Sequence, residues 1–252
     1  MKMTQRPENL SEKEKLKDLK GKKKLQYIWD YYKLPVVVFL IFLYIIGYMI
    51  HGRITHKDVT LYTAFVNTAV SDTLREKLSD DFLKSQKIDT SKNKFYIYSD
   101  LYLTDNEESE YHQYTYASRM KILGAIDAGE LDIVLMNKEA FDAFAQNGYL
   151  YNLQELFSLY KESSDLYKYA EPYLVSNTAI IKDNSLDLYF DDSITYEAET
   201  EEYPMALDLS QSRFIKNSGF QETLYLGIIA NSSRTDAAMS YIHYLFPESA
   251  SR

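Results

Sequence analysis

The chain has 252 residues, of which 46% are hydrophobic and 26% charged, a balance typical of a folded protein and not of a disordered one. It contains no cysteine, which excludes disulfides, thiol nucleophiles and zinc sites with cysteine ligands. The net charge of -9 argues against a nucleic-acid-binding protein that depends on an overall basic surface. The charge is unevenly distributed, because residues 1–33 hold ten Lys/Arg and five Asp/Glu, a net of +5, so residues 34–252 carry -14.

An apolar segment separates these two charge regimes. Leu34–Ile50 has no charged residue over seventeen positions. As a helix it would be about 26 Å long, close to the roughly 30 Å of a bilayer's hydrocarbon core. A cleaved signal peptide would need a cleavage site with small residues directly after the apolar segment, and Tyr48–Arg53 offers none. The other alternative is a buried core helix, which would seldom lack a polar face over this length. We expect a basic cytoplasmic arm at 1–33, a single transmembrane helix at 34–52 in the cell membrane, and an extracellular domain at 53–252.

Strand-like and helix-like segments alternate in residues 53–252, which is the pattern of an α/β sheet. Four segments have the composition of strands: 58–66, 94–99, 131–136 and 223–230. Helical periodicity lies between or after them, over 70–82, 114–128, 137–148, 153–160 and 235–246. Ser71 and Asn137 stand where helix N-caps are expected. We predict an α/β fold in which the four strands share one mostly parallel sheet with flanking helices.

The middle of the chain is less regular. Its pattern predicts a strand pair at 178–181 and 186–190, followed by further strand character at 203–209. The acidic segment 187–202 has no assigned role, because it lacks the spacing of a calcium-binding loop and is best interpreted as solvated charge.

Motifs that carry catalysis are missing from the sequence. The four histidines show no metal-binding spacing, and there is no nucleophile elbow, P-loop or dinucleotide-binding glycine motif. Adjacent carboxylates occur at Asp80-Asp81 and Asp191-Asp192, where solvated turns are the simpler explanation. We therefore expect no enzyme, no catalytic residue, no metal site and no cofactor, and no nucleic acid as a partner.

One stretch has more specificity. Residues 125–135 read AIDAGELDIVL, and Phe141, Phe144, Gly148 and Leu153 follow in register with a helix, a glycine turn and a second helix. This stretch resembles the helix–turn–strand signature of extracellular solute-binding proteins of ABC importers, which have the type II periplasmic-binding-protein fold. The late strand and helix of that family are similar to residues 226–246, so the resemblance covers roughly 58–153 and 203–246.

The chain also departs from that family. It has no lipobox cysteine, and an uncleaved apolar helix stands in place of a leader. Residues 154–202 are too few for the family's full second lobe, so they are expected to form a reduced second lobe or a cap. The family's ligand-contacting residues vary too much to be carried over, and fold therefore transfers better than function.

In an open α/β sheet, ligands bind beyond the carboxyl ends of the strands. Polar residues follow four of the predicted strands at these ends, and they are our candidate ligand-binding residues: Asn67, Thr68, Ser99, Asp100, Asn137, Asn231 and Ser232. The alternative is that they are helix caps and loop starts, which would explain Asn137 without a ligand.

The resemblance implies a membrane-anchored binding or accessory subunit of a transporter, of the ABC type, or of a signalling complex. Its partners would be the bilayer and integral transporter or sensor subunits, and its ligand a small molecule or peptide. The alternative is a protein–protein interaction module that has kept the fold and lost the ligand. Because the middle segment is small, we expect weak or absent capture of free small molecules by the isolated domain.

Overall fold

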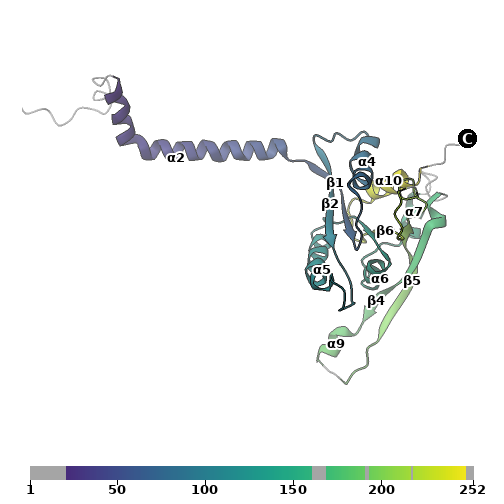
Figure 1. The fold of residues 1–252 in the computed structure, drawn as a ribbon. Coiled ribbons are helices and arrows are strands. Elements are labelled where there is room, and N and C mark those ends of the chain that lie inside the picture. Colours follow the sequence, from purple (N-terminus) through teal and green to yellow (C-terminus); the bar gives the residue numbers. More distant parts are fainter. Residues whose placement is uncertain (1–20, 161–168, 191–192, 217, 248–252) are drawn as a thin grey trace, which may run out of the picture. The chain divides into compact units, whose positions relative to one another are not determined.

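The computed structural model describes residues 21–160, 169–190, 193–216 and 218–247, so residues 1–20 of the basic arm lie outside the described part. The chain divides into two units, Met1–His56 and Lys57–Arg252. The first unit contains the helix α2 (Lys22–Thr55; Figure 1), and its stretch Lys33–Arg53 contains no buried residue. This helix is long and apolar enough to cross a membrane, a property that it shares with signal sequences.

The second unit is built on one six-stranded sheet with the strand order β2-β1-β3-β6-β5-β4. Its strands are β1 (Asp58–Val66), β2 (Asn93–Leu101), β3 (Ile133–Met136), β4 (Leu174–Asp183), β5 (Ala198–Asp208) and β6 (Tyr225–Ile228). The four strands predicted to share a sheet are β1, β2, β3 and β6, and all four belong to it. The α/β class is thereby confirmed.

The expectation of a mostly parallel sheet is wrong. β1 runs parallel to β2 and β3, but the β3–β6, β6–β5 and β5–β4 pairs are antiparallel. Parallel neighbours need crossover connections, and helical crossovers lead from β1 to β2 and from β2 to β3, which places β1, β2 and β3 parallel to one another. Residues 174–208 instead fold back on themselves as a hairpin, and β6 enters between β3 and β5 antiparallel to both.

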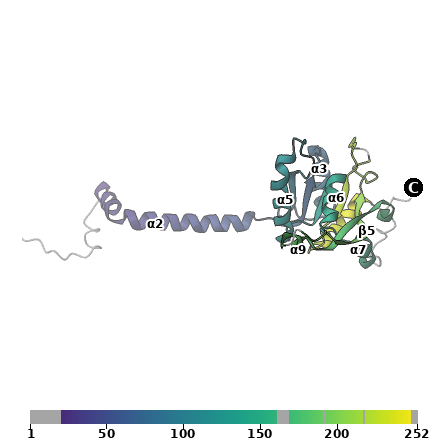
Figure 2. The ribbon, with the colours of Figure 1, turned by 90° about the horizontal axis from the view of Figure 1, so that it is seen from below.

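Helices cover both faces of the sheet (Figures 1 and 2). The helical elements of this unit are α3 (Asp72–Leu78), α4 (Asp80–Ser85), α5 (His112–Asp127), α6 (Lys138–Gln146), α7 (Leu153–Tyr160), the 3-10 turn η1 (Glu171–Tyr173), α9 (Ser185–Phe190) and α10 (Thr235–Leu245). Side chains of α3, α4, α7 and α10 share one buried cluster with the sheet, and those of α5 and α6 share the other. Because every residue of β3 is buried, its sequence is continuously apolar.

Two N-caps predicted from the sequence are confirmed. The Ser71 hydroxyl accepts a hydrogen bond from the Leu74 amide at the start of α3. The Asn137 side-chain oxygen accepts one from the Ala140 amide at the start of α6. Each satisfies an amide that has no partner within its helix, which fixes where the helix begins.

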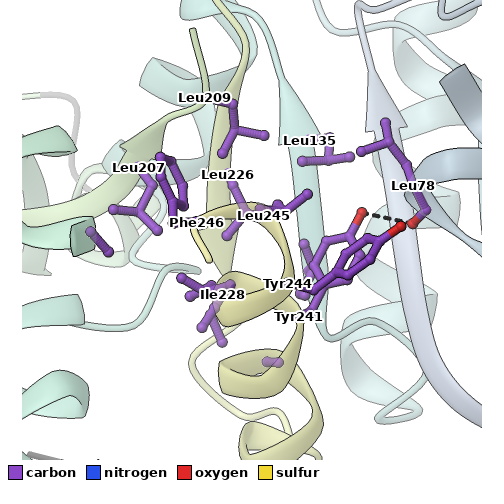
Figure 3. Close-up of a cluster of buried hydrophobic side chains, with 14 of the residues drawn as sticks. Leu78, Leu135, Leu207, Leu209, Leu226, Ile228, Tyr241, Tyr244, Leu245 and Phe246 are labelled. Carbon is purple, nitrogen blue, oxygen red and sulfur yellow. Dashed lines mark hydrogen bonds between the residues drawn. The ribbon is translucent and has the colours of Figure 1, made fainter. Parts of the chain in front are cut away.

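The last helix is tied to the first helix of the sheet domain by two tyrosines. The hydroxyl of the fully buried Tyr241 donates to the Leu78 carbonyl at 2.8 Å (Figure 3). The hydroxyl of Tyr244 donates to the Lys77 carbonyl, also at 2.8 Å. Both carbonyls lie at the carboxyl end of α3, where a helix has no internal donors left. Burial raises the pKa of Tyr241 far above its usual range and that of Tyr244 to about 12, so both phenols stay protonated donors.

The middle segment 154–202 holds α7, β4, α9 and the first part of β5, and its two strands belong to the single sheet. Figure 1 shows the β4–β5 hairpin extending from the sheet with α9 near its tip. The strand predicted at 178–181 lies within β4 and the one at 203–209 largely within β5, but the strand predicted at 186–190 is wrong, because this stretch is α9. Asp183 accepts from the Ser185 amide, and Asn184 bonds across to Thr195 and Glu197, so local polar contacts start a helical turn there.

We predict that Tyr241→Phe lowers the free energy of unfolding by about 1–2 kcal/mol, because the buried Leu78 carbonyl loses its donor while the ring packing is kept. Urea denaturation followed by circular dichroism measures the change. Tyr116→Phe is the matched control, because the Tyr116 side chain is 76% exposed, and its unfolding midpoint should not move. Equal stability of the Tyr241→Phe variant and the unaltered chain would contradict this assignment.

Candidate functional site

A cleft of about 530 Å³ lies beyond the carboxyl ends of β1 and β3. Its lining comes from four segments: 67–69 after β1, 102–111 after β2, 137–139 after β3, and 219–222 before β6. The fourth segment reaches the cleft because β6 is antiparallel to β3, so that its beginning lies at the same edge of the sheet as the end of β3. The sequence prediction missed residues 219–222, because it assumed that β6 runs parallel to β1 and β3 and therefore ends at this edge of the sheet.

Three of the predicted ligand-binding residues line this cleft: Asn67, Thr68 and Asn137. Asn67 has a positive φ of 53°, a conformation that Asn adopts more readily than most residues. Its amide group donates to the Leu103 carbonyl at 2.6 Å and to the Asn137 side-chain oxygen at 3.2 Å, and its oxygen accepts from the Leu103 amide at 2.7 Å. The Thr68 hydroxyl lies within hydrogen-bonding distance of the carbonyl oxygens of Val66 and Leu135, to either of which it can donate.

These hydrogen bonds give the three residues a clear structural task. Asn67 links the end of β1 to the segment after β2 and to the start of α6, and Asn137 also caps α6. Their polar groups are therefore committed to shaping the rim of the cleft. The alternative raised from the sequence, that such residues serve as caps and loop starts, accounts for their side-chain contacts.

Ser99 and Asp100 do not line the cleft. They lie within β2, the outermost strand of the sheet, and the Ser99 hydroxyl donates to the Asp100 carboxylate at 2.8 Å. Asp100 has a positive φ of 59° and falls where the pairing of β1 with β2 shifts register. Because β2 runs on to Leu101, the residues that reach the cleft are the later Tyr102 and Thr104.

Asn231 and Ser232 lie at the other edge of the sheet, since β6 runs opposite to β1 and β3. The Asn231 amide group donates to the Ile126 carbonyl at 2.9 Å, and the Ser232 hydroxyl donates to the Asp132 carboxylate at 2.7 Å. Both side chains hold the connection that leads from β6 to α10. The antiparallel direction of β6 is thus the reason that these two candidates are separated from the other five.

Asp132, the acid of the AGELD stretch, is the centre of a buried polar network. Its side chain is fully buried, and its two oxygens accept from the Tyr62 amide at 2.8 Å and from the Ser232 hydroxyl. The Arg234 guanidinium lies 3.4 Å from the same carboxylate, donates to the Gly129 carbonyl at 2.9 Å, and stacks over the Tyr62 ring at 4.8 Å. The acid after the glycine turn therefore joins β1, β3 and the β6–α10 connection.

Besides Thr104, Ser109 and Gln221, the rest of the cleft lining offers aromatic rings and acids. Tyr102 and Tyr111 are stacked with ring centroids 4.3 Å apart and planes 7° from parallel, and Phe220 adds a third ring to the lining. Glu139 and Glu222 supply carboxylates. The hydrogen bond of Tyr111 to Glu110, together with the charge of that carboxylate, raises the pKa of Tyr111, which therefore stays a neutral phenol.

Among the described residues no group of three or more His, Asp or Glu side chains could hold a metal ion. A second hollow of about 210 Å³, between α5 and α6, is lined mainly by apolar side chains with Arg119 and Asn147. Within the described chain, the cleft at the ends of β1 and β3 offers the larger set of polar and aromatic groups.

We predict that Asp132→Asn lowers the free energy of unfolding by about 3 kcal/mol, because an amide cannot accept from all the donors that now surround the buried carboxylate. Urea titration reports the loss, with Asp127→Asn as the control at an exposed acid at the end of α5. An unchanged midpoint for Asp132→Asn would show that the network does not support the fold.

Neither a family model nor a curated protein matches the chain. A solved structure that is similar over 76% of this chain and 80% of its own is that of the PBP AttC from Agrobacterium tumefaciens strain C58 in an open unliganded conformation. The two chains share 10% sequence identity, with a TM-score of 0.35.

Proposed function

We propose that the chain is a single-pass membrane protein whose outer domain serves as a binding or accessory subunit of a transporter, of the ABC type, or of a signalling complex. The observation that supports this most directly is the cleft at the ends of β1 and β3, in a unit that follows an apolar helix. The cleft volume of about 530 Å³ falls within the usual range of small-molecule sites.

The anchoring part of the proposal rests on α2 and on the charge of the chain. Seventeen uncharged residues, Leu34–Ile50, follow an arm of net charge +5. Basic segments next to a membrane-spanning helix stay in the cytoplasm, which would place the N-terminus inside and residues 53–252 outside. The exposed apolar side chains of this helix would then face lipid.

The cleft supports weak capture of free ligand. The strands of the middle segment join the same sheet as β1 and β3, and the described residues hold no second sheet that could close over the cleft. A bound molecule would keep part of its surface in water, which limits the affinity that burial can supply. Anchoring in the membrane would raise the local concentration of the domain near an integral partner.

The second candidate function is a protein-interaction module, and the β4–β5 hairpin is the observation that favours it. Large apolar side chains are exposed towards its end: Ile181 at 57%, Phe190 at 84% and Tyr196 at 49%. Three glutamates lie in the neighbouring half of β5, Glu199, Glu201 and Glu202, and Glu197 lies just before the strand. Aromatic rings are enriched in protein–protein interfaces and polar groups form their rim, so this surface is suited to contact with another protein subunit.

Topology is tested by labelling, because the chain has no natural cysteine. In intact cells, a membrane-impermeant thiol reagent should modify a cysteine introduced as Glu201→Cys and leave Gln5→Cys unmodified. Permeabilised cells, in which both should react, control for access to the reagent. Labelling of Gln5→Cys alone in intact cells would reverse the topology and remove the basis for an outer domain.

The accessory role predicts that purified full-length chain in lipid nanodiscs binds no free sugar, amino acid or short peptide with submicromolar affinity in calorimetry. It also predicts that an integral membrane protein co-purifies with the chain after mild solubilisation. Submicromolar capture of a free solute would replace the accessory role with that of a conventional solute receptor. Purification without any integral partner would count against both candidate functions.

A further inference from the structure

We propose that the cleft at the ends of β1 and β3 binds a small organic cation, a primary amine or a guanidinium compound. This inference rests on the proposed binding function of the cleft and specifies the chemistry of its ligand. It is carried by three features of the lining: two carboxylates without cationic neighbours, a stacked pair of tyrosines, and an N-cap that leaves little attraction for an anion.

The charged groups of the described cleft lining are both acids. Glu139 lies in the first turn of α6 and Glu222 lies just before β6, and the lining includes no Lys, Arg or His. Lys138, the nearest base in sequence to Glu139, is paired with Asp142 on the next turn of α6. Neither glutamate has a hydrogen-bond or salt-bridge partner within the described chain, so both carboxylates are open to a positively charged ligand.

The aromatic part of the lining favours the same class of ligand. Tyr102 and Tyr111 stack face to face, and Tyr114 packs against Tyr102 with the ring centroids 6.2 Å apart. The Tyr111 ring, which is 41% exposed, is therefore the one that is open to other groups. Ammonium and guanidinium groups are attracted to aromatic faces, and guanidinium also stacks on them as a flat group. Phe220 lies in the segment that also carries Glu222, so a ring and a carboxylate come together from that side of the cleft.

An anionic ligand is disfavoured by the same residues. The amino end of α6 would attract an anion, but the Asn137 side chain already accepts from the Ala140 amide there, and the Glu139 carboxylate occupies the positive end of the helix. Three further acids, Glu107, Glu108 and Glu110, are exposed in the segment that contributes Ser109 and Tyr111 to the lining. The summed field draws cations towards the cleft and repels anions.

The size of the cleft suits a compact ligand. Its volume of about 530 Å³ can hold a four-carbon diamine or an amino acid such as arginine, together with water. Because one side of the cleft is open, we expect a dissociation constant of about 10 μM to 1 mM, weaker than that of enclosed solute receptors. This range agrees with the weak capture expected of an accessory subunit.

The test compares charged probes with neutral molecules of nearly the same shape, using the full-length chain in nanodiscs of neutral lipid. Calorimetry at low salt measures 1,4-diaminobutane against 1,4-butanediol, and L-arginine against L-citrulline. The variants Glu139→Gln and Glu222→Gln each remove one charge at nearly constant volume. Glu201→Gln on β5 is the matched control, because it removes the same charge from an exposed site outside the cleft lining.

We expect at least one cationic probe to bind while its neutral counterpart does not. Each cleft variant should weaken that binding about tenfold, as for the loss of one charge-assisted contact, and Glu201→Gln should leave it unchanged. Equal binding of a cationic probe and its neutral counterpart would overturn the cation assignment, and the cleft would then be a binding site for another class of ligand. Equal weakening by Glu201→Gln would show that net charge, and not the cleft, attracts the probe.

Absence of binding for all four probes would also overturn the inference. The proposed function would then still be judged separately, by the labelling of Glu201→Cys and by co-purification with an integral partner. Melting temperatures of the three glutamine variants, all at exposed positions, should match that of the unaltered chain, so a lost signal reports on binding and not on folding.

Discussion

The direction of β6 is the constraint on which the cleft depends. β6 fits between β3 and β5 and pairs antiparallel with both, with Gly227 opposite Val134 on one side and opposite Ala206 on the other. A Cβ at Gly227 would lie only 2.7 Å from a methyl group of the buried Leu150, so glycine allows this close packing. The direction brings the residues before β6 to the carboxyl ends of β1 and β3 and sends those after β6 to the other edge.

The two edges of the sheet, at opposite ends of its strands, consequently differ in structure. At one edge, Asn67 and Asn137 bond to one another and to the segment after β2, which leaves a cleft with free acids and aromatic rings. At the other edge, the buried Asp132 gathers the Tyr62 amide, the Ser232 hydroxyl and the Arg234 guanidinium into a closed network. At the second edge the polar groups around Asp132 are hydrogen-bonded to one another. At the first edge the carboxylates of Glu139 and Glu222 face the cleft, where a ligand could reach them.

Local patterns in the sequence were enough to predict much of the fold. The continuously apolar β3, the caps Ser71 and Asn137 and the apolar helix at 34–50 are each determined by neighbouring residues, and the structure has them in place. Strand direction is different, because an apolar run such as residues 225–228 has the same composition whichever way it pairs. That is why Asn231 and Ser232 were expected at the cleft and residues 219–222 were not.

The same limit applies to the middle segment. Residues 186–190 alternate like a strand, but the contacts of Asn184 with Thr195 and Glu197 close the hairpin and start a helical turn. Those partners are more than ten positions away in sequence, so periodicity alone does not reveal them. The strands of residues 154–202, expected to form a reduced second lobe or a cap, extend the single sheet.

The direction of β6 can be measured in the full-length chain without any ligand. Pairs of spin labels, introduced as cysteines at the exposed positions Ala69, Gln221 and Ser233, give two distances by electron–electron dipolar spectroscopy. The account predicts that the distance from residue 69 to residue 221 is much shorter than that from residue 69 to residue 233, because only residue 221 shares the cleft edge. The reverse order would mean that β6 runs parallel to β3, and the cleft described here would not exist.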